Sequence, residues 1–119
     1  MPYEIVKIDG PVMVIRIDGI VRLAEHQALQ ATAKKAIEGG IKPRVLVRAE
    51  GFKGWEKNVD WGDVSFLMAF GDEIEKMAFV GDEKWKDDVF MFTAKGLRKT
   101  LIEYFPSSAL AQAEKWIRG

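Results

Sequence analysis

The sequence has no cysteine and a single histidine, His26, among its 119 residues. Without cysteine it can form no disulfide, thiolate nucleophile or cysteine-ligated metal site. Its 18 basic and 18 acidic residues cancel, so it lacks the positive field that binding to a nucleic-acid backbone requires. No apolar run approaches the roughly 20 residues of a membrane-spanning helix, and the first residues do not resemble a signal peptide. We therefore expect a cytoplasmic protein with no nucleic-acid partner and no integral membrane segment.

Nucleophiles are also scarce. A catalytic triad built on His26 would have to draw on three serines and three threonines, and none lies in a G-x-S-x-G turn. Paired carboxylates occur at Asp72-Glu73, Asp82-Glu83 and Asp87-Asp88. Each pair falls at an expected helix end or on a solvated face, where capping explains it, and a metal site would need several converging ligands. The sequence thus predicts a protein that is not an enzyme and binds no metal or cofactor.

Hydrophobic residues make up 48% of the chain, which is typical of a folded protein. A chain of this length forms one domain that buries roughly two-thirds of its unfolded surface. We predict a single domain over residues 1–119.

Strand and helix patterns alternate along this domain. Polar–apolar alternation predicts strands at Tyr3–Ile8, Val12–Asp18, Arg44–Glu50, Lys76–Val80 and Lys99–Phe105. Helical spacing predicts helices at about Val21–Glu38, Asp60–Phe70 and Glu83–Lys95, with a last one from Ser107 or Ser108 to about Ile117. Gly51–Asn58 is predicted to be a loop. The order ββαβαβαβα predicts an α/β fold with a mainly parallel five-stranded sheet, whose first two strands form an antiparallel hairpin.

Every predicted strand carries a charged residue on one of its two faces. These residues are Lys7, Arg16, Arg48, Lys76 and Glu103. Parallel strands that are covered on both faces are nearly continuous in apolar residues. We therefore expect the helices to lie mostly on one side of the sheet, with the other side thinly covered or used for contacts.

We expect the segment Glu75–Trp85 to form the structural centre of the fold. Its strand ends at Gly81, and Asp82 can cap the helix that follows. Trp85 falls in the first turn of that helix, where we expect it to be substantially buried. In α/β proteins ligands usually bind near the carboxyl ends of the strands, which makes this end of the sheet a candidate site.

Aromatic residues gather in the loops and helices that flank this central strand. We take six of them as candidate ligand-binding or partner-binding residues: Phe52, Trp55, Trp61, Phe66, Phe70 and Trp85. Phe52 and Trp55 lie in the predicted glycine-flanked loop, where we expect them to be exposed. For Phe66, Phe70 and Trp85 the simpler interpretation is that they are core residues. The predicted helix Asp60–Phe70 ends with six apolar residues in seven, more than a helix covering one face of a sheet requires.

The order of elements and two segments, M-A-F-V-G-D-E-K-W at Met77–Trp85 and I-E-Y-F-P at Ile102–Pro106, resemble the SpoIIAA-like family. These are small bacterial proteins of the STAS type, similar in fold to CRAL-TRIO lipid-carrying domains. The segments G-F-K-G-W and W-G-D-V-S-F-L are also similar to that family. The resemblance implies strands in nearly sequential order with helices winding as a superhelix. It also implies two functions, regulation through protein partners and binding of a small apolar molecule.

One departure from the resemblance concerns phosphorylation. Anti-sigma factor antagonists carry a phosphorylatable serine in a D-x-S motif where the third strand meets its helix. Here the segment Ala49–Trp61 reads A-E-G-F-K-G-W-E-K-N-V-D-W and holds no serine or threonine. Ser65, the nearest one, falls within the apolar helix and would be a poor kinase target. We therefore do not carry the phosphorylation switch over to this chain.

The leading hypothesis is a non-enzymatic module that binds a small apolar or lipid-like ligand in a pocket near the second helix and the Phe52/Trp55 loop. The alternative is a protein–protein interaction or regulatory module that acts as a homodimer or with a partner.

Overall fold

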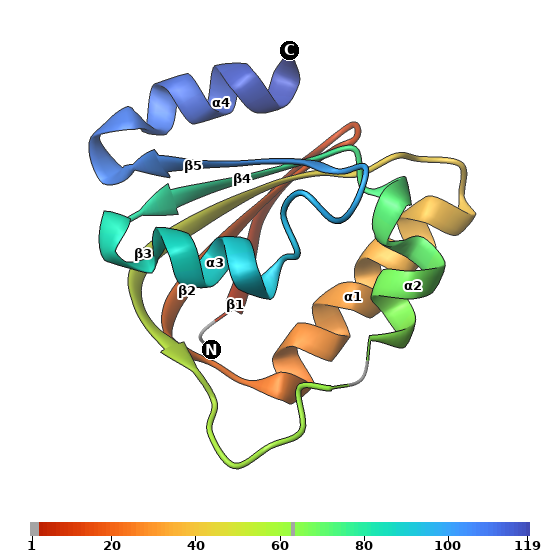
Figure 1. The fold of residues 1–119 in the computed structure, drawn as a ribbon. Helices are drawn as coiled ribbons and strands as arrows, with labels where there is room; N and C mark the ends of the chain where they lie inside the picture. Colours follow the sequence, from red (N-terminus) through yellow and green to blue (C-terminus); the bar gives the residue numbers. More distant parts are fainter. Residues whose placement is uncertain (1–2, 63) are drawn as a thin grey trace.

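The computed structural model describes residues 3–62 and 64–119, which form a five-stranded sheet with helices on both of its faces (Figure 1). The strands are β1 (Tyr3–Asp9), β2 (Val12–Val21), β3 (Arg44–Trp55), β4 (Lys76–Gly81) and β5 (Leu101–Pro106). The helices are α1 (Leu23–Glu38), α2 (Ser65–Phe70), α3 (Lys86–Phe92) and α4 (Leu110–Arg118). Short 3₁₀ turns occupy Gly71–Glu73, Glu83–Trp85 and Ser107–Ala109. In the described residues no helix is long and apolar enough to cross a membrane.

The strands lie in the sheet in the order in which they occur in the chain, β1-β2-β3-β4-β5. β1 and β2 form an antiparallel hairpin, and every later pair is parallel. The predicted α/β class, the ββαβαβαβα order and the mainly parallel sheet are therefore confirmed.

The two faces of the sheet are covered unequally. On one face, under α1, α2 and α3, lies the larger core, which includes Ile15, Val47 and Phe79. On the other face α4 alone packs against the sheet, with Leu46 and Ile117 fully buried in a smaller core. Strand alternation accounts for this division, since neighbours in sequence point to opposite faces. The expectation that the helices lie mostly on one side is confirmed.

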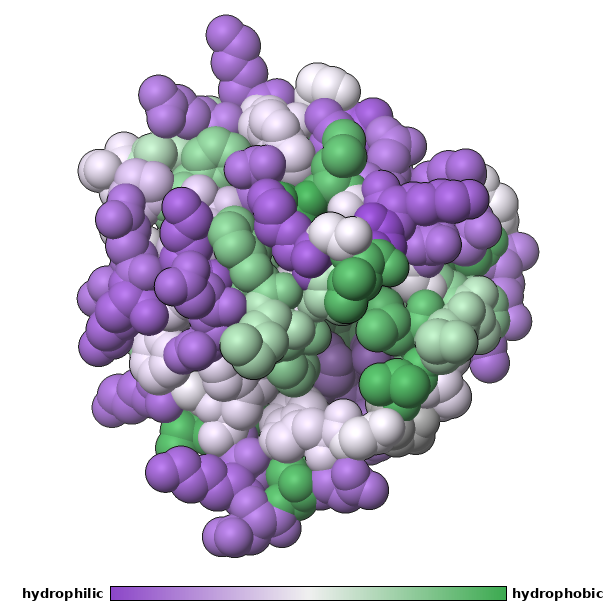
Figure 2. All heavy atoms as spheres, viewed as in Figure 1, coloured by the Kyte–Doolittle hydropathy of each residue, from purple (hydrophilic) through white to green (hydrophobic). Residues whose placement is uncertain are grey.

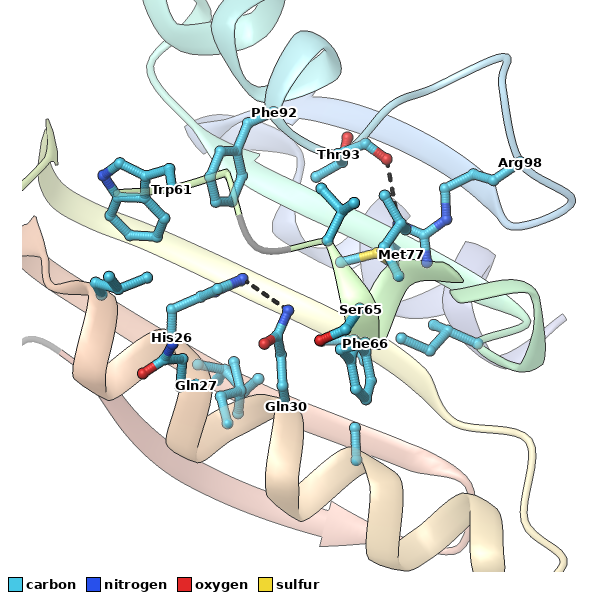
Figure 3. Close-up of a pocket in the computed structure, with 18 of the residues that line it drawn as sticks. His26, Gln27, Gln30, Trp61, Ser65, Phe66, Met77, Phe92, Thr93 and Arg98 are labelled. Atoms are coloured by element: carbon cyan, nitrogen blue, oxygen red, sulfur yellow. Dashed lines mark hydrogen bonds between the residues drawn. The ribbon is translucent and has the colours of Figure 1, made fainter. Parts of the chain in front are cut away.

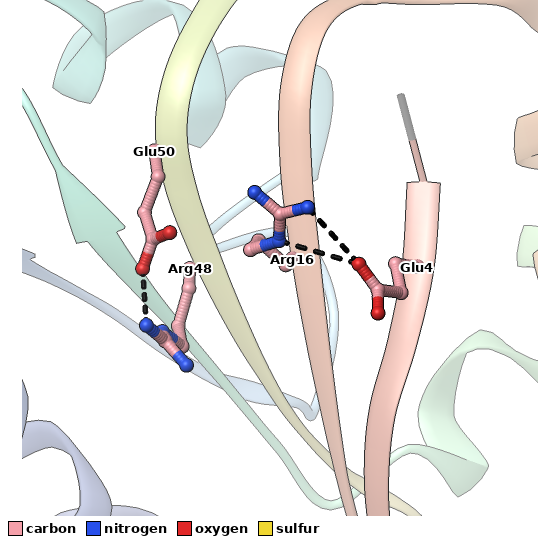
Figure 4. A network of polar contacts seen from close by, with 4 residues as sticks. All are labelled: Glu4, Arg16, Arg48 and Glu50. Atoms are coloured by element: carbon pink, nitrogen blue, oxygen red, sulfur yellow. Dashed lines mark hydrogen bonds and ion pairs between the residues drawn. The ribbon is translucent and has the colours of Figure 1, made fainter. Parts of the chain in front are cut away.

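Charged side chains occupy the α4 face of the sheet where α4 does not reach. Arg16 Nη2 of β2 lies 3.0 Å from Glu4 Oε2 of β1, and within β3 Arg48 pairs with Glu50 (Figure 4). Such partly exposed pairs contribute at most about 1 kcal/mol each. They keep this part of the sheet solvated, which is why its strands tolerate charged residues.

The prediction of a loop at Gly51–Asn58 is wrong for Gly51–Trp55. Gly51–Trp55 continues β3, and its residues pair with β2 through Gly19 opposite Phe52 and Val21 opposite Trp55. Gly51 has a φ of +79° and Gly54 a φ of +104°, so glycine allows the strand to bend here without ending. The pairing of Val21 also moves the start of α1 from Val21 to Leu23.

Two further predicted helices are shorter than expected. The helix predicted over Asp60–Phe70 begins only at Ser65, and Asp63 within it lies outside the described residues. The helix predicted over Glu83–Lys95 starts as a 3₁₀ turn, in which Asp82 Oδ1 accepts a hydrogen bond from Lys84 N at 3.0 Å. α3 then runs only to Phe92, and β5 begins at Leu101 instead of Lys99.

Candidate functional site

A pocket of about 200 Å³ lies between α1, α2 and the sheet (Figure 3). Its floor is made by side chains of three neighbouring strands, Met13, Ile15, Val45 and Met77. Leu29 and Ala33 of α1 form one wall, and residues of α2 form the other. The remaining lining residues include Trp61, Phe66, Phe92, Thr93 and Arg98.

The pocket lies over the beginnings of the parallel strands. Met13, Val45 and Met77 stand side by side in the sheet, each the second residue of its strand. Asp82 and Trp85, which follow the carboxyl end of β4, do not line it. From the strand beginnings the pocket extends to Leu23 and Trp61, which follow the carboxyl ends of β2 and β3.

His26 is the polar centre of the α1 wall. Its Nε2 accepts a hydrogen bond from Gln30 Nε2 at 3.2 Å, so its Nδ1 carries the proton and faces Tyr3 Oη at 3.4 Å. The edges of two aromatic rings pack against it, Trp61 at 5.7 Å and Phe92 at 5.3 Å between centroids. Burial lowers the pKa of His26, which favours this neutral form. The histidine is therefore a packed, hydrogen-bonded residue of the wall.

Arg98 supplies the charge at another part of the pocket. Its Nη2 donates to the Gly71 carbonyl oxygen at 2.7 Å and its Nη1 to the Thr93 carbonyl oxygen at 3.1 Å. Figure 3 shows the guanidinium directed from its loop toward Met77, whose sulfur is 4.0 Å from Nη1. Burial lowers the pKa of Arg98 and Asp72 opposes this shift, but a guanidinium keeps its proton. In the described part of the chain Arg98 forms no ion pair with a carboxylate.

The six predicted aromatic site residues separate into two groups. Trp61 and Phe66 line the pocket, and Trp61 is held by a hydrogen bond of 2.9 Å from its Nε1 to the Glu56 carbonyl oxygen. Phe70 does not line it but packs against Phe66, with 5.7 Å between ring centroids. Phe52, Trp55 and Trp85 lie elsewhere.

The second group forms an aromatic cluster at the carboxyl ends of β3 and β4. Phe52 packs edge-on against Trp55 at 5.0 Å and against Trp85 at 4.8 Å, and the two indoles are 6.1 Å apart. Phe52 is only 9% exposed, so its expected exposure on a loop is wrong. Trp55 and Trp85 are both partly buried and pack against the larger core. This agrees with the burial expected for Trp85, whereas the exposure expected for Trp55 is wrong. Phe92 links the cluster to the pocket, because it lines the pocket and lies 5.1 Å from Trp55.

Several polar pocket residues, among them Gln30 and Arg98, are absent from the sequence-based candidates. Gln30 could have been found as the residue one helical turn after His26. Arg98 lies in the polar segment 95–100, K-G-L-R-K-T, where no local pattern distinguishes it from the neighbouring lysines. In the described residues no group of three or more histidine, aspartate or glutamate side chains could hold a metal ion.

Exposed apolar side chains surround the helices that border the pocket. Met68 of α2 is 81% exposed, Met91 of α3 is 80% exposed and Leu97 of the following loop is 89% exposed. Figure 2 shows apolar atoms gathered around a hollow between α2 and α3. Leu67 and Phe92, which are the sequence neighbours of Met68 and Met91, line the pocket.

Comparisons with solved structures show the same fold. An uncharacterized protein of the DUF3478 family with a SpoIIAA-like fold, from Shewanella loihica PV-4, matches with a TM-score of 0.70 and 14% identity over 97% of this chain and 91% of that chain. The anti-sigma factor antagonist SpoIIAA in its unphosphorylated form matches with a TM-score of 0.63 and 14% identity over 98% of both chains. The Bacillus cell fate determinant SpoIIAA in its phosphorylated form matches with a TM-score of 0.53 and 15% identity, over 82% of this chain and 89% of that one.

Sequence comparison gives one assignment. No curated protein matches the chain, whereas the model of the SpoIIAA-like family matches residues 12–118. The match spans β2 through α4, and thus every strand and helix that lines the pocket. The chain therefore belongs to the SpoIIAA-like family.

Proposed function

We propose that this protein is a non-enzymatic, cytoplasmic binding module that takes a small apolar ligand into the pocket between α1, α2 and the sheet. The observation that carries the proposal is the pocket itself, about 200 Å³ in volume and walled mainly by aliphatic and aromatic side chains. This is the volume of about seven water molecules, and it lies below the roughly 300–1,000 Å³ of pockets for drug-sized ligands. A compact ligand therefore fits best.

Apolar burial supplies the driving force for such a ligand. Each Å² of apolar surface removed from water contributes roughly 25 cal/mol, and the floor residues Met13, Val45 and Met77 present apolar side chains to such a ligand. His26 is an unsuitable catalytic base because both of its ring nitrogens already face hydrogen-bond partners. Binding without chemistry is the simplest use of these residues.

Filling the pocket from α1 tests this proposal. Ala33 lines the pocket and is buried, so an Ala33→Leu side chain would occupy space that the ligand needs. Ala31 lies on the same helix but is exposed, which makes Ala31→Leu the matched control. Binding of a fluorescent apolar probe should weaken at least about tenfold in Ala33→Leu and stay unchanged in Ala31→Leu, with both variants folded by circular dichroism.

Two results would contradict the proposal. One is equal probe binding by Ala33→Leu and wild type, which would place the probe elsewhere on the surface. The other is the failure of wild type to bind any apolar probe or to carry a small molecule in native mass spectrometry.

The exposed apolar surface of α2 and α3 supports a second candidate, an interaction module that acts as a homodimer or with a partner. Met68, Met91 and Leu97 together expose more apolar surface than scattered single residues do. If this surface mediates self-association, sedimentation should show a dimer in wild type and a monomer in a Met68→Lys/Leu97→Lys variant. A wild-type monomer at every concentration would exclude the homodimer.

A further inference from the structure

We infer that the ligand of this pocket is a small carboxylate, whose negatively charged group is held by Arg98 while its compact apolar body lies among the aromatic side chains. This inference rests on the proposed function and names the class of ligand. It follows from the position of Arg98, the charges around it and the character of the rest of the pocket.

The hydrogen bonds of Arg98 fix its guanidinium without using all of its donors. A guanidinium has five N–H groups in a rigid planar fork. Nη1 faces the Thr93 carbonyl oxygen and the Met77 sulfur, and one N–H of Nη2 faces the Gly71 carbonyl oxygen. Nε is buried and has no acceptor among residues 3–62 and 64–119. Because Nε is buried, the second N–H of Nη2 is the donor left for a ligand, and a guanidinium held in a fixed orientation at the pocket can donate it to a carboxylate in a charge-assisted hydrogen bond.

The charges around Arg98 do not neutralise it. The described lining residues include no aspartate or glutamate, and Arg98 is the one charged residue among them apart from His26, which is held neutral. Asp72 is the carboxylate that acts on Arg98 through space, but its Oδ1 accepts a hydrogen bond from Lys99 N at 3.0 Å and it is exposed. A partly buried charge without a close partner is costly, and a bound anion would remove that cost.

A single guanidinium favours a ligand with a single negative charge. No lysine lines the pocket and Arg98 is its one arginine among the described residues, so a dianionic phosphate would leave one charge uncompensated. Trp61, Phe66 and Phe92 provide aromatic faces and edges for the body of the ligand. On the α1 side Gln30 and His26 add polar groups (Figure 3). A monocarboxylate with an aromatic or branched apolar body matches all three features.

The test compares two probes that differ in charge and hardly in shape, phenylacetate and its neutral amide, phenylacetamide. Each is titrated into wild type and followed by two-dimensional NMR, with binding located by shifts of pocket residues such as Ala33. Phenylacetate should bind at least about tenfold more tightly than phenylacetamide, since hydrogen bonds to charged groups are the stronger ones. Its affinity should fall with added salt, whereas that of the amide should not.

Variants assign the preference to Arg98. Arg98→Gln should bind both probes with the affinity that wild type has for phenylacetamide, and Arg98→Lys should keep part of the preference. Arg16→Gln is the matched control, because it removes the same charge from the opposite, exposed face of the sheet. If Arg98→Gln does not fold, since it loses bonds to Gly71 and Thr93, the comparison of the two probes on wild type still decides.

The outcomes separate this inference from the proposed function. Equal or tighter binding of phenylacetamide in the pocket overturns the carboxylate inference and leaves the apolar pocket standing. Failure of both probes and of the fluorescent apolar probe overturns the proposed function. A carboxylate preference that persists in Arg98→Gln would show that another group holds the anion, and would overturn the role given to Arg98.

Discussion

Replacing Trp55 with alanine should destabilise the protein about as much as replacing Trp85. Both indoles are half-buried and both pack edge-on against the buried ring of Phe52, at 5.0 Å for Trp55 and 4.8 Å for Trp85. Full truncation of a buried aromatic residue costs about 3–5 kcal/mol, and partial exposure lowers this to about 2–3 kcal/mol here. This differs from a tryptophan on a mobile loop, whose loss would cost under about 1 kcal/mol.

A double-mutant cycle shows whether the two residues act as one cluster. Their centroids are 6.1 Å apart in an edge-to-face arrangement, which contributes about 0.5–1.5 kcal/mol beyond the buried area. Urea melts followed by circular dichroism give the free energies of unfolding of both single variants and of the double variant. The sum of the single losses should exceed the double loss by that coupling energy.

The control for this cycle is Trp116→Ala. Trp116 is also half-buried, but it packs on α4 against Phe105, on the other face of the sheet. Its loss should add to that of Trp55 without coupling. A loss below about 1 kcal/mol for Trp55→Ala, or no coupling with Trp85, would refute the view that β3 continues as a packed strand through Trp55.

Three further predictions concern single positions. Burial lowers the pKa of His26 below its ordinary 6.5, so the unfolded state takes up a proton at a higher pH than the folded state. Urea melts should therefore show that the free energy of unfolding falls as the pH drops below about 6.5. The His26→Gln variant should lack this fall. Burial, together with the charge of Asp82, raises the pKa of Tyr104 from 10.0 to about 12. Urea melts at rising pH should therefore show the free energy of unfolding falling between pH 10 and about pH 12, and the Tyr104→Phe variant should not show this fall. A methyl group at Gly81 would lie 3.1 Å from both Cβ and the carbonyl oxygen of Ala49, so Gly81→Ala should cost about 1–3 kcal/mol in thermal melts, whereas Gly39→Ala at a looser helix end should cost less.

The architecture could be predicted because strand alternation records which face of the sheet a residue occupies. In β3 the sequence assigns Val45 and Val47 to one face and Leu46 and Arg48 to the other, and the two cores divide them in this way. Glycine or proline also marks three of the strand ends, at Gly10 after β1, at Gly81 in β4 and at Pro106 in β5. Local sequence patterns are therefore sufficient to predict the order of the elements and the face of the sheet to which each strand residue points.

The misplaced loop at Gly51–Trp55 has a different origin. A glycine in a sequence usually indicates a turn. Here Gly51 and Gly54 instead adopt positive φ within an irregular part of β3, which pairs with β2, a strand distant along the chain. The exposure expected for Phe52 was wrong for the same reason. The tertiary pairing, which no local pattern contains, decides the outcome.

The sequence-based hypothesis was a pocket near the second helix and the Phe52/Trp55 loop. Of its six candidates Trp61 and Phe66 line the pocket, whereas Phe52 and Trp55 do not. Phe66 belongs to the apolar segment 64–70, and Trp61 to the aromatic residues that flank the central strand. Arg98 could not be predicted from the sequence, because two hydrogen bonds set its position. One goes to the carbonyl oxygen of Gly71, which is distant along the chain, and the other to that of Thr93 at the end of α3.

The strictly sequential order of the strands also determines on which face of the sheet the pocket lies. In doubly wound folds the strand order reverses at a switch point, and the two diverging loops there open a crevice at the carboxyl ends. This sheet has no reversal, so successive right-handed crossovers advance in one direction and place α1, α2 and α3 on the same face. Packed aromatic rings close the carboxyl ends of β3 and β4, and the free space lies between the crossover helices and the sheet.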